Sequence, residues 1–483
     1  MSIRNDRESQ RRRRTKIVCT IGPASKSPKL IEELIREGMD VARLNFSHGS
    51  HEEHSLAIRH IRKISGRLKK PVAILQDLAG PKIRTGLLQN GPIVLKEGQT
   101  FTLTTRQVPG NEKETSLNHS LLPPEVRSGN TILLADGSLE LRVEEVTSTD
   151  IKCRVISGGT LTSQQGINLP DADLEIPFLS KKDQRDLLFG INHKVDFIGI
   201  SFVREAHNIL QVRKILKEEA GEGISLIAKI EKRKALDNID QIIEVADGIM
   251  IARGDLGVEV PLEEVPLAQK AIIRKCNLAG KPVITATQML ESMVRNPRPT
   301  RAEVTDVANA IFDGTDAIML SEETALGKYP LKSIRIMNKI AIRTEESLDY
   351  EKILQERALS VKATVPDAIS NATCQVAHDL KAAAIVIFTL SGSTARLVAR
   401  YRPGVPIMAG SPEESTVRKL ALSWGVYPHK SQKIKDTDDM ICKAKNTARR
   451  IGRLSRGEII VITAGIPFAI TGITNLIKVE TID

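Results

Sequence analysis

The sequence predicts an α/β protein: a (β/α)8 barrel with an inserted all-β domain and a C-terminal α/β domain. Three observations support this fold class. Eight short apolar runs alternate with amphipathic stretches, a segment of different composition interrupts the alternation after the third run, and the alternation restarts after residue 345. Alternating strands and helices are typical of a parallel sheet, and eight such units can close it into a barrel.

The predicted barrel occupies residues 15–80 and 178–345. Amphipathic stretches such as Ser27–Glu37 and Pro266–Ala279 lie between most of its apolar runs. Their apolar residues recur at helical spacing, so these stretches are expected to be helices that cover the barrel. The eight runs predicted as strands are Lys16–Thr20, Val41–Phe46, Val72–Gln76, Phe197–Ser201, Ser225–Ile230, Gly248–Ala252, Pro282–Ala286 and Ala317–Leu320.

Residues 81–177 are predicted to form the inserted all-β domain. Short strand-like segments are separated there by turn signals such as Asn90-Gly91 and Asp136-Gly137. Helical pattern resumes after Ser180, a candidate helix N-cap. Since active sites of such barrels lie at the carboxyl ends of the strands, a domain inserted there is expected to act as a lid.

Residues 346–483 are predicted to form a separate, smaller α/β domain. Its apolar strand candidates are Ala382–Thr389, Val405–Ala409, Glu458–Thr463 and Asn475–Val479, with a helical pattern at Ala368–Leu380. The low aromatic content of 3% suits parallel α/β layers better than an aromatic-rich sandwich.

The sequence composition indicates the cellular compartment to expect. The five cysteines are scattered without metal-ligand spacing, which predicts free thiols in a reducing compartment. The N-terminus lacks an apolar signal core and no apolar run reaches membrane-spanning length, so a cytoplasmic location without membrane contact is expected.

The formal net charge is +11, which an anionic small substrate or a nucleic acid could explain. The densest basic run is Arg11–Arg14. We interpret residues 1–14 as a solvated basic arm, and nucleic-acid binding is disfavoured because no aromatic residues interleave with these arginines.

Polar residues follow almost every barrel run. Lys229 and Glu231 flank Ile230, so both side chains can point to one side of their strand. Carboxylates bind a hard cation such as Mg²⁺, and lysine and arginine clamp a transferring phosphoryl group. The pattern therefore predicts Mg²⁺-dependent phosphoryl transfer centred on Lys229, Glu231 and Asp255; a structural salt-bridge network at the barrel mouth is the alternative.

Seven motifs then become recognisable in order along the chain. They are Arg43–Gly49 (RLNFSHG), Gly80–Thr85 (GPKIRT), Lys229–Glu231 (KIE), Ala252–Gly257 (ARGDLG), Thr285–Met293 (TATQMLESM), Pro299–Ala308 (PTRAEVTDVA) and Asp313–Ser321 (DGTDAIMLS). Together they resemble pyruvate kinase. The resemblance implies the glycolytic conversion of phosphoenolpyruvate and ADP into pyruvate and ATP, a barrel with a lid and an effector-binding C-terminal domain, and a homotetramer.

The resemblance also implies roles for individual residues. Glu231 and Asp255 would coordinate Mg²⁺, or Mn²⁺ in its place, and a second Mg²⁺ would arrive with the nucleotide. Lys229 and Arg43 would hold the transferring phosphoryl group, and Arg84 would reach the nucleotide phosphates. The amides around Gly254 and Asp255, together with Thr287, would hold the substrate carboxylate, and Thr287 would lie near the carbon that gains a proton.

Two positions depart from the family pattern. Relatives that need K⁺ bind it through positions matching Asn45, Ser47, Asp77 and the carbonyl of Leu78, and carry Glu where this chain has Lys82. An ammonium on the chain can replace the monovalent cation, so we expect activity without K⁺; the alternative is a surface lysine without that role.

The second departure is Gln165, which stands where a nucleotide-binding lysine is common. A neutral amide cannot supply the same charge, so we do not assign it a nucleotide role.

The C-terminal domain carries a hydroxyl-rich loop between a predicted strand and a helix, formed by Thr389, Ser391, Gly392, Ser393 and Thr394. Hydroxyls and amides at a helix start can bind an anion, although plain helix capping explains the same residues. The matching loop of several relatives holds an effector phosphate, which implies a sugar phosphate or AMP as activator.

Two other functions stay open at this point. A barrel of this kind could perform carbon–carbon chemistry on phosphoenolpyruvate or pyruvate with one Mg²⁺, but that chemistry needs neither a nucleotide lid nor Arg84. A regulator without activity could retain the barrel, but the complete set of Lys229, Glu231, Asp255 and Thr287 argues against loss of activity.

Overall fold

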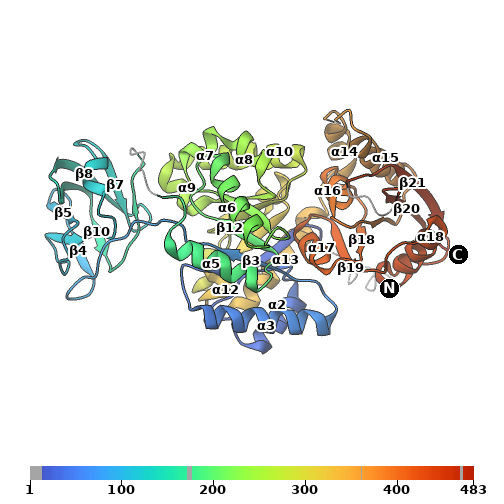
Figure 1. Cartoon of the computed structure of the whole chain (residues 1–483), viewed down its shortest axis with the longest axis horizontal. Helices are drawn as coiled ribbons and strands as arrows, with labels where there is room; N and C mark the ends of the chain where they lie inside the picture. The colour runs from blue at the N-terminus through green and yellow to red at the C-terminus, as the bar shows by residue number, and fades with distance from the viewer. Residues whose placement is uncertain (1–12, 171–176, 361, 468–471) are drawn as a thin grey trace.

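The computed structural model describes residues 13–170, 177–360, 362–467 and 472–483. Figure 1 shows three bodies in a row: an all-β domain, a central barrel wrapped in helices, and an α/β domain. Within the described residues, no helix combines the length and apolar character needed to cross a membrane. The predicted fold class is confirmed.

Eight parallel strands close the central barrel in the order β1-β16-β15-β14-β13-β12-β3-β2. Each agrees with a predicted apolar run to within one or two residues. Aliphatic side chains such as Val41, Leu75 and Met250 fill the interior. The strands are β1 (Lys16–Thr20), β2 (Val41–Asn45), β3 (Ala73–Asp77), β12 (Phe197–Ile200), β13 (Ser225–Ile230), β14 (Gly248–Ala252), β15 (Val283–Ala286) and β16 (Ala317–Leu320).

The helices around the barrel begin at recognisable caps. The Ser180 hydroxyl accepts the Asp183 N–H, which confirms the predicted N-cap of α5. Ser50 with Glu53 and Thr300 with Glu303 form capping boxes for α3 and α11. The covering helices include α2 (Pro28–Glu37), α3 (His51–Leu68), α5 (Lys181–Asn192), α6 (Ala206–Glu218), α8 (Ile239–Val245), α10 (Val265–Ala279), α11 (Arg301–Phe312) and α13 (Pro330–Glu345).

The chain leaves the barrel after β3 and builds the inserted domain, which has its own core around Phe101, Leu141 and Ile151. A six-stranded sheet runs in the order β11-β7-β8-β9-β5-β6, beside a two-stranded sheet of β10 and β4. The strands are β4 (Ile93–Leu95), β5 (Thr100–Thr104), β6 (Glu114–Ser116), β7 (Thr131–Leu134), β8 (Leu139–Val146), β9 (Asp150–Ser157), β10 (Gly159–Leu161) and β11 (Ile167–Asn168), with a short helix α4 (Leu122–Glu125).

The C-terminal domain has a five-stranded sheet in the order β19-β18-β17-β20-β21. One edge strand, β19, escaped prediction because its sequence, Val-Tyr-Pro-His-Lys, is not an apolar run. The antiparallel strand β21 lies on the other edge. The elements are α14 (Tyr350–Ala358), α15 (Val365–Asp379), β17 (Ala384–Phe388), α16 (Ser393–Arg400), β18 (Ile407–Ser411), α17 (Glu414–Lys419), β19 (Val426–Lys430), α18 (Thr437–Thr447), β20 (Ile459–Ala464) and β21 (Leu476–Thr481).

Four aspartates tie the amino-terminal end of the barrel together. Asp40, Asp196, Asp247 and Asp316 each precede an alternate barrel strand. Their carboxylates accept the backbone N–H groups of Ile17, Ile74, Leu226 and Val283 at 2.8–3.0 Å. Each also pairs with an arginine, and Arg402 and Arg418, which bind Asp316 and Asp196, come from the C-terminal domain. These contacts fasten that domain to the bottom of the barrel.

The last two residues of the predicted basic arm, Arg13 and Arg14, pack against the folded domains. Arg13 donates to Asp40 and to the Gly38 carbonyl, and its side chain is only 7% exposed. Arg14 donates to the Tyr350 hydroxyl and lies over the Tyr350 ring. The prediction of a solvated arm is therefore wrong for these two residues, because each guanidinium finds acceptors in the barrel or the C-terminal domain. Arg11 and Arg12 lie outside the described residues.

Candidate active site

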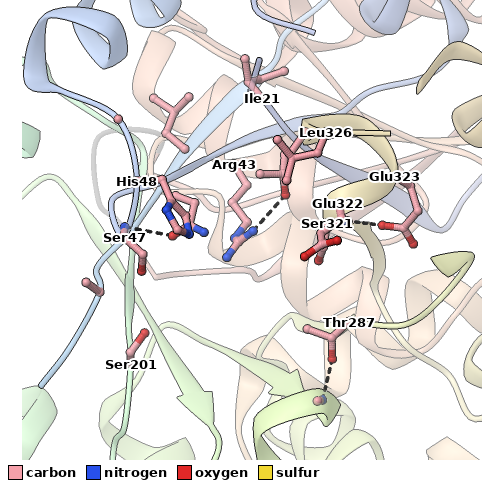
Figure 2. A pocket seen from close by; sticks show the side chains of 18 of the residues that line it. Ile21, Arg43, Ser47, His48, Ser201, Thr287, Ser321, Glu322, Glu323 and Leu326 are labelled. Carbon is pink, nitrogen blue, oxygen red and sulfur yellow. Dashed lines mark hydrogen bonds between the residues drawn. The ribbon is translucent and has the colours of Figure 1, made fainter. Parts of the chain in front are cut away.

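A pocket of about 690 Å³ opens at the carboxyl ends of the barrel strands. Figure 2 shows Arg43, Ser201, Thr287 and Ser321 around one space, each at a different strand end. Lys229, Glu231 and Asp255 line the same pocket, as do Lys82, Arg84 and Asp136 of the inserted segment. The pocket thus brings together the predicted residues Arg43, Arg84, Lys229, Glu231, Gly254, Asp255 and Thr287.

Lys229 lies at the centre of the buried part of the site. Its Nζ atom is 2.7 Å from Glu231 Oε1 and 3.2 Å from Asp77 Oδ1. It also donates to the Ser201 hydroxyl at 2.8 Å. Burial alone would lower the pKa of Lys229, but the charges of Asp77 and Glu231 outweigh it and hold that pKa above its ordinary value. The lysine is therefore a fixed positive charge.

Glu231 and Asp255 supply carboxylate oxygens from the segments that follow the neighbouring strands β13 and β14. Glu231 is almost fully buried, and its Oε2 atom accepts the Phe202 N–H at 2.7 Å. Burial raises the pKa of the Glu231 carboxyl, Lys229 opposes the rise, and the nearby charge of Asp255 adds to it. Two carboxylates close enough to repel each other form a site that favours a cation between them.

Arg43 is held beside Lys229 by a shared carboxylate. Its Nε atom donates to Asp77 Oδ2 at 2.6 Å, and another guanidinium nitrogen donates to the Thr20 hydroxyl at 3.0 Å. Burial opposes ionisation of Asp77, but Lys229 and Arg43 together hold its pKa below the ordinary value. Asp77 therefore keeps two cations at fixed places on one wall of the pocket.

The opposite wall is formed where α9 (Arg253–Glu259) follows β14. The Gly254 N–H donates to the Thr287 hydroxyl at 2.7 Å, a bond drawn in Figure 2. Thr287 in turn donates to the carbonyl of Ala286 at 2.6 Å. Thr287, Gly254 and Asp255 thus lie together, as predicted for one end of a substrate.

The inserted domain contributes three polar contacts near the mouth. Lys82 Nζ is 3.4 Å from Asp255 Oδ1 and 3.9 Å from Asp136 Oδ1. Arg84 lines the pocket while one of its guanidinium nitrogens donates to the Gln164 carbonyl at 3.0 Å. The Gln165 side chain instead bonds to the Thr162 hydroxyl within its own domain.

Comparison with known proteins agrees with this geometry. A family model described as "Pyruvate kinase, barrel domain" matches residues 12–334, and one described as "Pyruvate kinase, alpha/beta domain" matches residues 367–480. The chain belongs to the pyruvate kinase family. This membership favours phosphoryl transfer over carbon–carbon chemistry and over a purely regulatory role.

Relatives match over nearly the whole chain. A pyruvate kinase from Clostridium acetobutylicum is 46% identical over 471 residues, covering 97% of this chain and 100% of its own length. One from Geobacillus stearothermophilus is 49% identical over 473 residues, covering 98% and 81%. A crystal structure of a pyruvate kinase from Cryptosporidium parvum superposes with a TM-score of 0.91 at 40% identity, covering 98% of this chain and 96% of that one.

The predicted monovalent-cation residues already have partners inside the chain. Asp77 binds Arg43 and Lys229, and the Leu78 carbonyl accepts the Ser201 hydroxyl at 2.7 Å. The Asn45 side-chain oxygen accepts the Ser47 N–H at 3.1 Å. Asn45 and Ser47 line the pocket together with Lys82.

Two residues in or beside this site were not among the predicted site residues. Ser201 connects Lys229 to Leu78, and Arg253 contacts the Thr287 loop from behind. Both directly follow a barrel strand, and that position was the available signal. Serine and arginine are common at strand ends, so their types alone did not mark them.

The hydroxyl-rich loop of the C-terminal domain borders a second pocket of about 640 Å³. Thr389 accepts the Gly392 N–H at 3.0 Å, and Thr394 is bonded to Thr474 at 2.8 Å. Ser391 and Ser393 line the pocket and bond to each other at 3.1 Å. Gly392 has φ 82°, a conformation that favours glycine. The two threonines thus have partners within the domain, and all four hydroxyl residues line the pocket together with residues such as Glu413, Lys433 and Lys435.

Proposed function

We propose that this member of the pyruvate kinase family transfers the phosphoryl group of phosphoenolpyruvate to ADP, giving pyruvate and ATP. The observation that carries the proposal is the pair of cations, Arg43 and Lys229, held by Asp77 beside two carboxylates in one pocket. Pre-arranged charge of this kind stabilises the oxygens of a transferring phosphoryl group without reorganisation during the reaction.

The roles divide between the two walls of the pocket. On one wall, Lys229 and Arg43 would bind the phosphoryl oxygens, and Arg84 would bind the nucleotide phosphates from the lid side. On the other, the amides around Gly254 and Asp255 and the Thr287 hydroxyl would hold the carboxylate of phosphoenolpyruvate. When the bond between the phosphorus and the enol oxygen breaks, the enolpyruvate carbon near Thr287 must gain a proton.

The carboxylate pair fits a divalent cation. Glu231 and Asp255 are hard oxygen donors that line one pocket, and the charge of Asp255 adds to the rise in the pKa of Glu231 that burial causes. They would hold Mg²⁺, or Mn²⁺, which prefers such ligands. Once bound, the metal would neutralise charge on the substrate carboxylate and phosphoryl oxygens.

Activity is proposed not to need K⁺. Lys82 brings a permanent positive charge into the pocket that also contains Asn45 and Ser47, the predicted monovalent-cation region. Its contact with Asp255 keeps that ammonium at the mouth rather than in solvent. The charge that a bound monovalent cation supplies would then come from the chain itself.

The C-terminal pocket is proposed to bind a phosphorylated metabolite, either a sugar phosphate or AMP. The serines at positions 391 and 393 and the start of α16 offer hydrogen-bond donors to a phosphate, and Lys433 and Lys435 add positive charge to the same pocket. A cytoplasmic location and a homotetramer also remain proposals.

A direct assay tests the main proposal. The purified chain is mixed with phosphoenolpyruvate, ADP and Mg²⁺, and pyruvate is measured by reduction with a coupling dehydrogenase, with and without K⁺. ADP-dependent pyruvate formation is expected; its absence with both Mg²⁺ and Mn²⁺ contradicts the proposal.

A further inference from the structure

The loop after β15 contains two consecutive non-glycine residues in the left-handed region. Thr287 has φ 66° and Gln288 has φ 56°. A positive φ is disfavoured for most side chains and is a genuine outlier for a β-branched residue such as threonine. The surrounding contacts must therefore impose this conformation, and both residues line the active-site pocket.

Two adjacent residues of α9 hold Thr287 at both its main chain and its side chain. A guanidinium nitrogen of Arg253 donates to the Thr287 carbonyl at 2.8 Å, and its Nε atom donates to the Ala286 carbonyl at 3.3 Å. The Gly254 N–H donates to the Thr287 hydroxyl at 2.7 Å. The carbonyl of the strained residue and its hydroxyl are thus bound from one short segment.

Arg253 is itself anchored from the far side. Its other terminal nitrogen donates to Asp306 Oδ1 of α11 at 2.7 Å and to Gln269 Oε1 of α10 at 3.3 Å. The side chain is only 11% exposed. A planar guanidinium can bridge two helices and two carbonyls at once, which a lysine ammonium on a flexible stem cannot reproduce.

Arg253 lies outside the set of described residues that line the pocket, whereas Gly254, Asp255, Thr287 and Gln288 belong to it. Its side chain is therefore not placed to touch a substrate. Any effect of its side chain on the reaction must be indirect, and the part of the pocket wall that this side chain holds is the Thr287 loop.

We propose that Arg253 is a positioning residue: it keeps Thr287 in the left-handed conformation and so sets where the Thr287 hydroxyl lies in the pocket. This inference rests on the proposed function, in which Thr287 lies between the substrate carboxylate and the carbon that gains a proton. Without the guanidinium, the loop can relax to a negative φ, which would turn the hydroxyl away from the Gly254 amide.

A double-mutant cycle tests this inference with four proteins: wild type, Arg253→Ala, Thr287→Ala and the double variant. The readouts are kcat for pyruvate formation, KM for phosphoenolpyruvate, and exchange of the pyruvate methyl protons with deuterium followed by NMR in the presence of Mg²⁺ and ATP. We expect R253A to lower both kcat and the exchange rate by about 30-fold or more. In the T287A background the same change should cost less than about threefold, because Arg253 acts through Thr287.

Several controls make the outcome decisive. Arg213, which donates to the Val245 carbonyl and to Asp247 at the other end of the barrel, is a matched arginine. Arg213→Ala should leave kcat within about threefold of wild type. Added guanidinium ion should partly restore R253A and leave the Arg213 variant unchanged. If R253A does not fold, Asp306→Asn weakens the same anchor and should show a smaller loss with the same dependence on Thr287.

The possible results distinguish failure of the positioning role from failure of the proposed function. A fully active R253A, or losses that multiply with T287A, would overturn the positioning role while leaving the proposed reaction intact. A wild-type chain that forms no pyruvate would overturn the proposed function and this inference with it.

Discussion

Lys82 Nζ lies 3.4 Å from Asp255 Oδ1, so a lysine at the start of the inserted domain faces a carboxylate of α9, the helix that follows β14 in the barrel. Both side chains are partly exposed, at 24% and 28%. The contact joins the inserted domain to the proposed metal site. It also explains how a charge on the inserted segment can influence chemistry inside the barrel.

Exchanging this lysine for a carboxylate should create a need for K⁺. Lys82→Glu removes the positive charge and adds a negative one, so a monovalent cation becomes necessary to balance the site. We expect wild-type activity to differ by less than about twofold between tetramethylammonium and K⁺ salts, and K82E to be stimulated by K⁺ about tenfold or more. Lys96→Glu, at an exposed lysine of the same domain, is the control. A wild-type enzyme that itself needs K⁺ would falsify the assignment.

Replacing Lys229 by methionine should abolish phosphoryl transfer while leaving the protein folded. The substitution removes a buried charge that binds Asp77 and Glu231, and kcat should fall by about 1000-fold, or about 4 kcal/mol of transition-state stabilisation. Mg²⁺ binding, followed by Mn²⁺ electron paramagnetic resonance, should persist because Glu231 and Asp255 remain. Lys275→Met, at an exposed pair with Asp240, is the control. Activity of Lys229→Met within about tenfold of wild type contradicts the assigned role.

The barrel and most of its site could be predicted because the signals are local. Eight apolar runs mark the strands, and in a barrel of parallel strands everything that follows a strand gathers at one mouth, so Lys229, Glu231 and Asp255 could be placed together. Contacts between distant segments could not be predicted in this way. The Arg253–Asp306 pair joins two helices that no periodicity relates.

Arg13 belongs to a basic run whose composition is typical of a solvated arm. It nevertheless donates a hydrogen bond to Asp40, because the chain lies against the barrel there. β19 was not predicted because its sequence contains a proline, a histidine and a lysine and so has no apolar pattern.

The pH dependence of stability should carry the signature of a buried lysine at the bottom of the barrel. Lys16 donates to the Val426 carbonyl at 2.6 Å, and burial lowers its pKa to about 8, against the partial opposition of Asp40. The unfolded chain keeps the Lys16 proton up to about pH 10.4, so between these values the unfolded state binds more protons and stability rises with pH.

Comparison with Lys16→Met isolates this effect. Between pH 8 and 9.5, the unfolding free energy of wild type relative to K16M should increase by about 1–2 kcal/mol, measured by urea denaturation. Below about pH 7 the difference between the two proteins should be flat. A constant difference from pH 7 to 10 would show that Lys16 keeps its ordinary pKa in the folded chain.

The C-terminal loop should communicate with the active site through α17. Thr416 donates to the Leu390 carbonyl at 2.7 Å, and two residues later Arg418 donates to Asp196 at 2.7 Å, at the start of β12. The residue after β12 is Ser201, whose hydroxyl accepts a hydrogen bond from the Lys229 ammonium. Arg418→Met should therefore weaken activation by a sugar phosphate or AMP, reducing the shift in half-saturating phosphoenolpyruvate about threefold or more. Basal kcat should change by less than about twofold, because Arg62 still pairs with Asp196.

Arg335→Met, at an exposed pair with Glu37 on the barrel surface, is the matched control and should leave activation unchanged. Saturation curves for phosphoenolpyruvate are measured with and without the effector for all three proteins, and effector binding is measured separately by calorimetry. Full activation in the Arg418 variant would mean that coupling between the domains runs through other contacts, such as Arg402 with Asp316. Loss of effector binding itself would mean that Arg418 shapes the effector pocket rather than transmitting its state to β12.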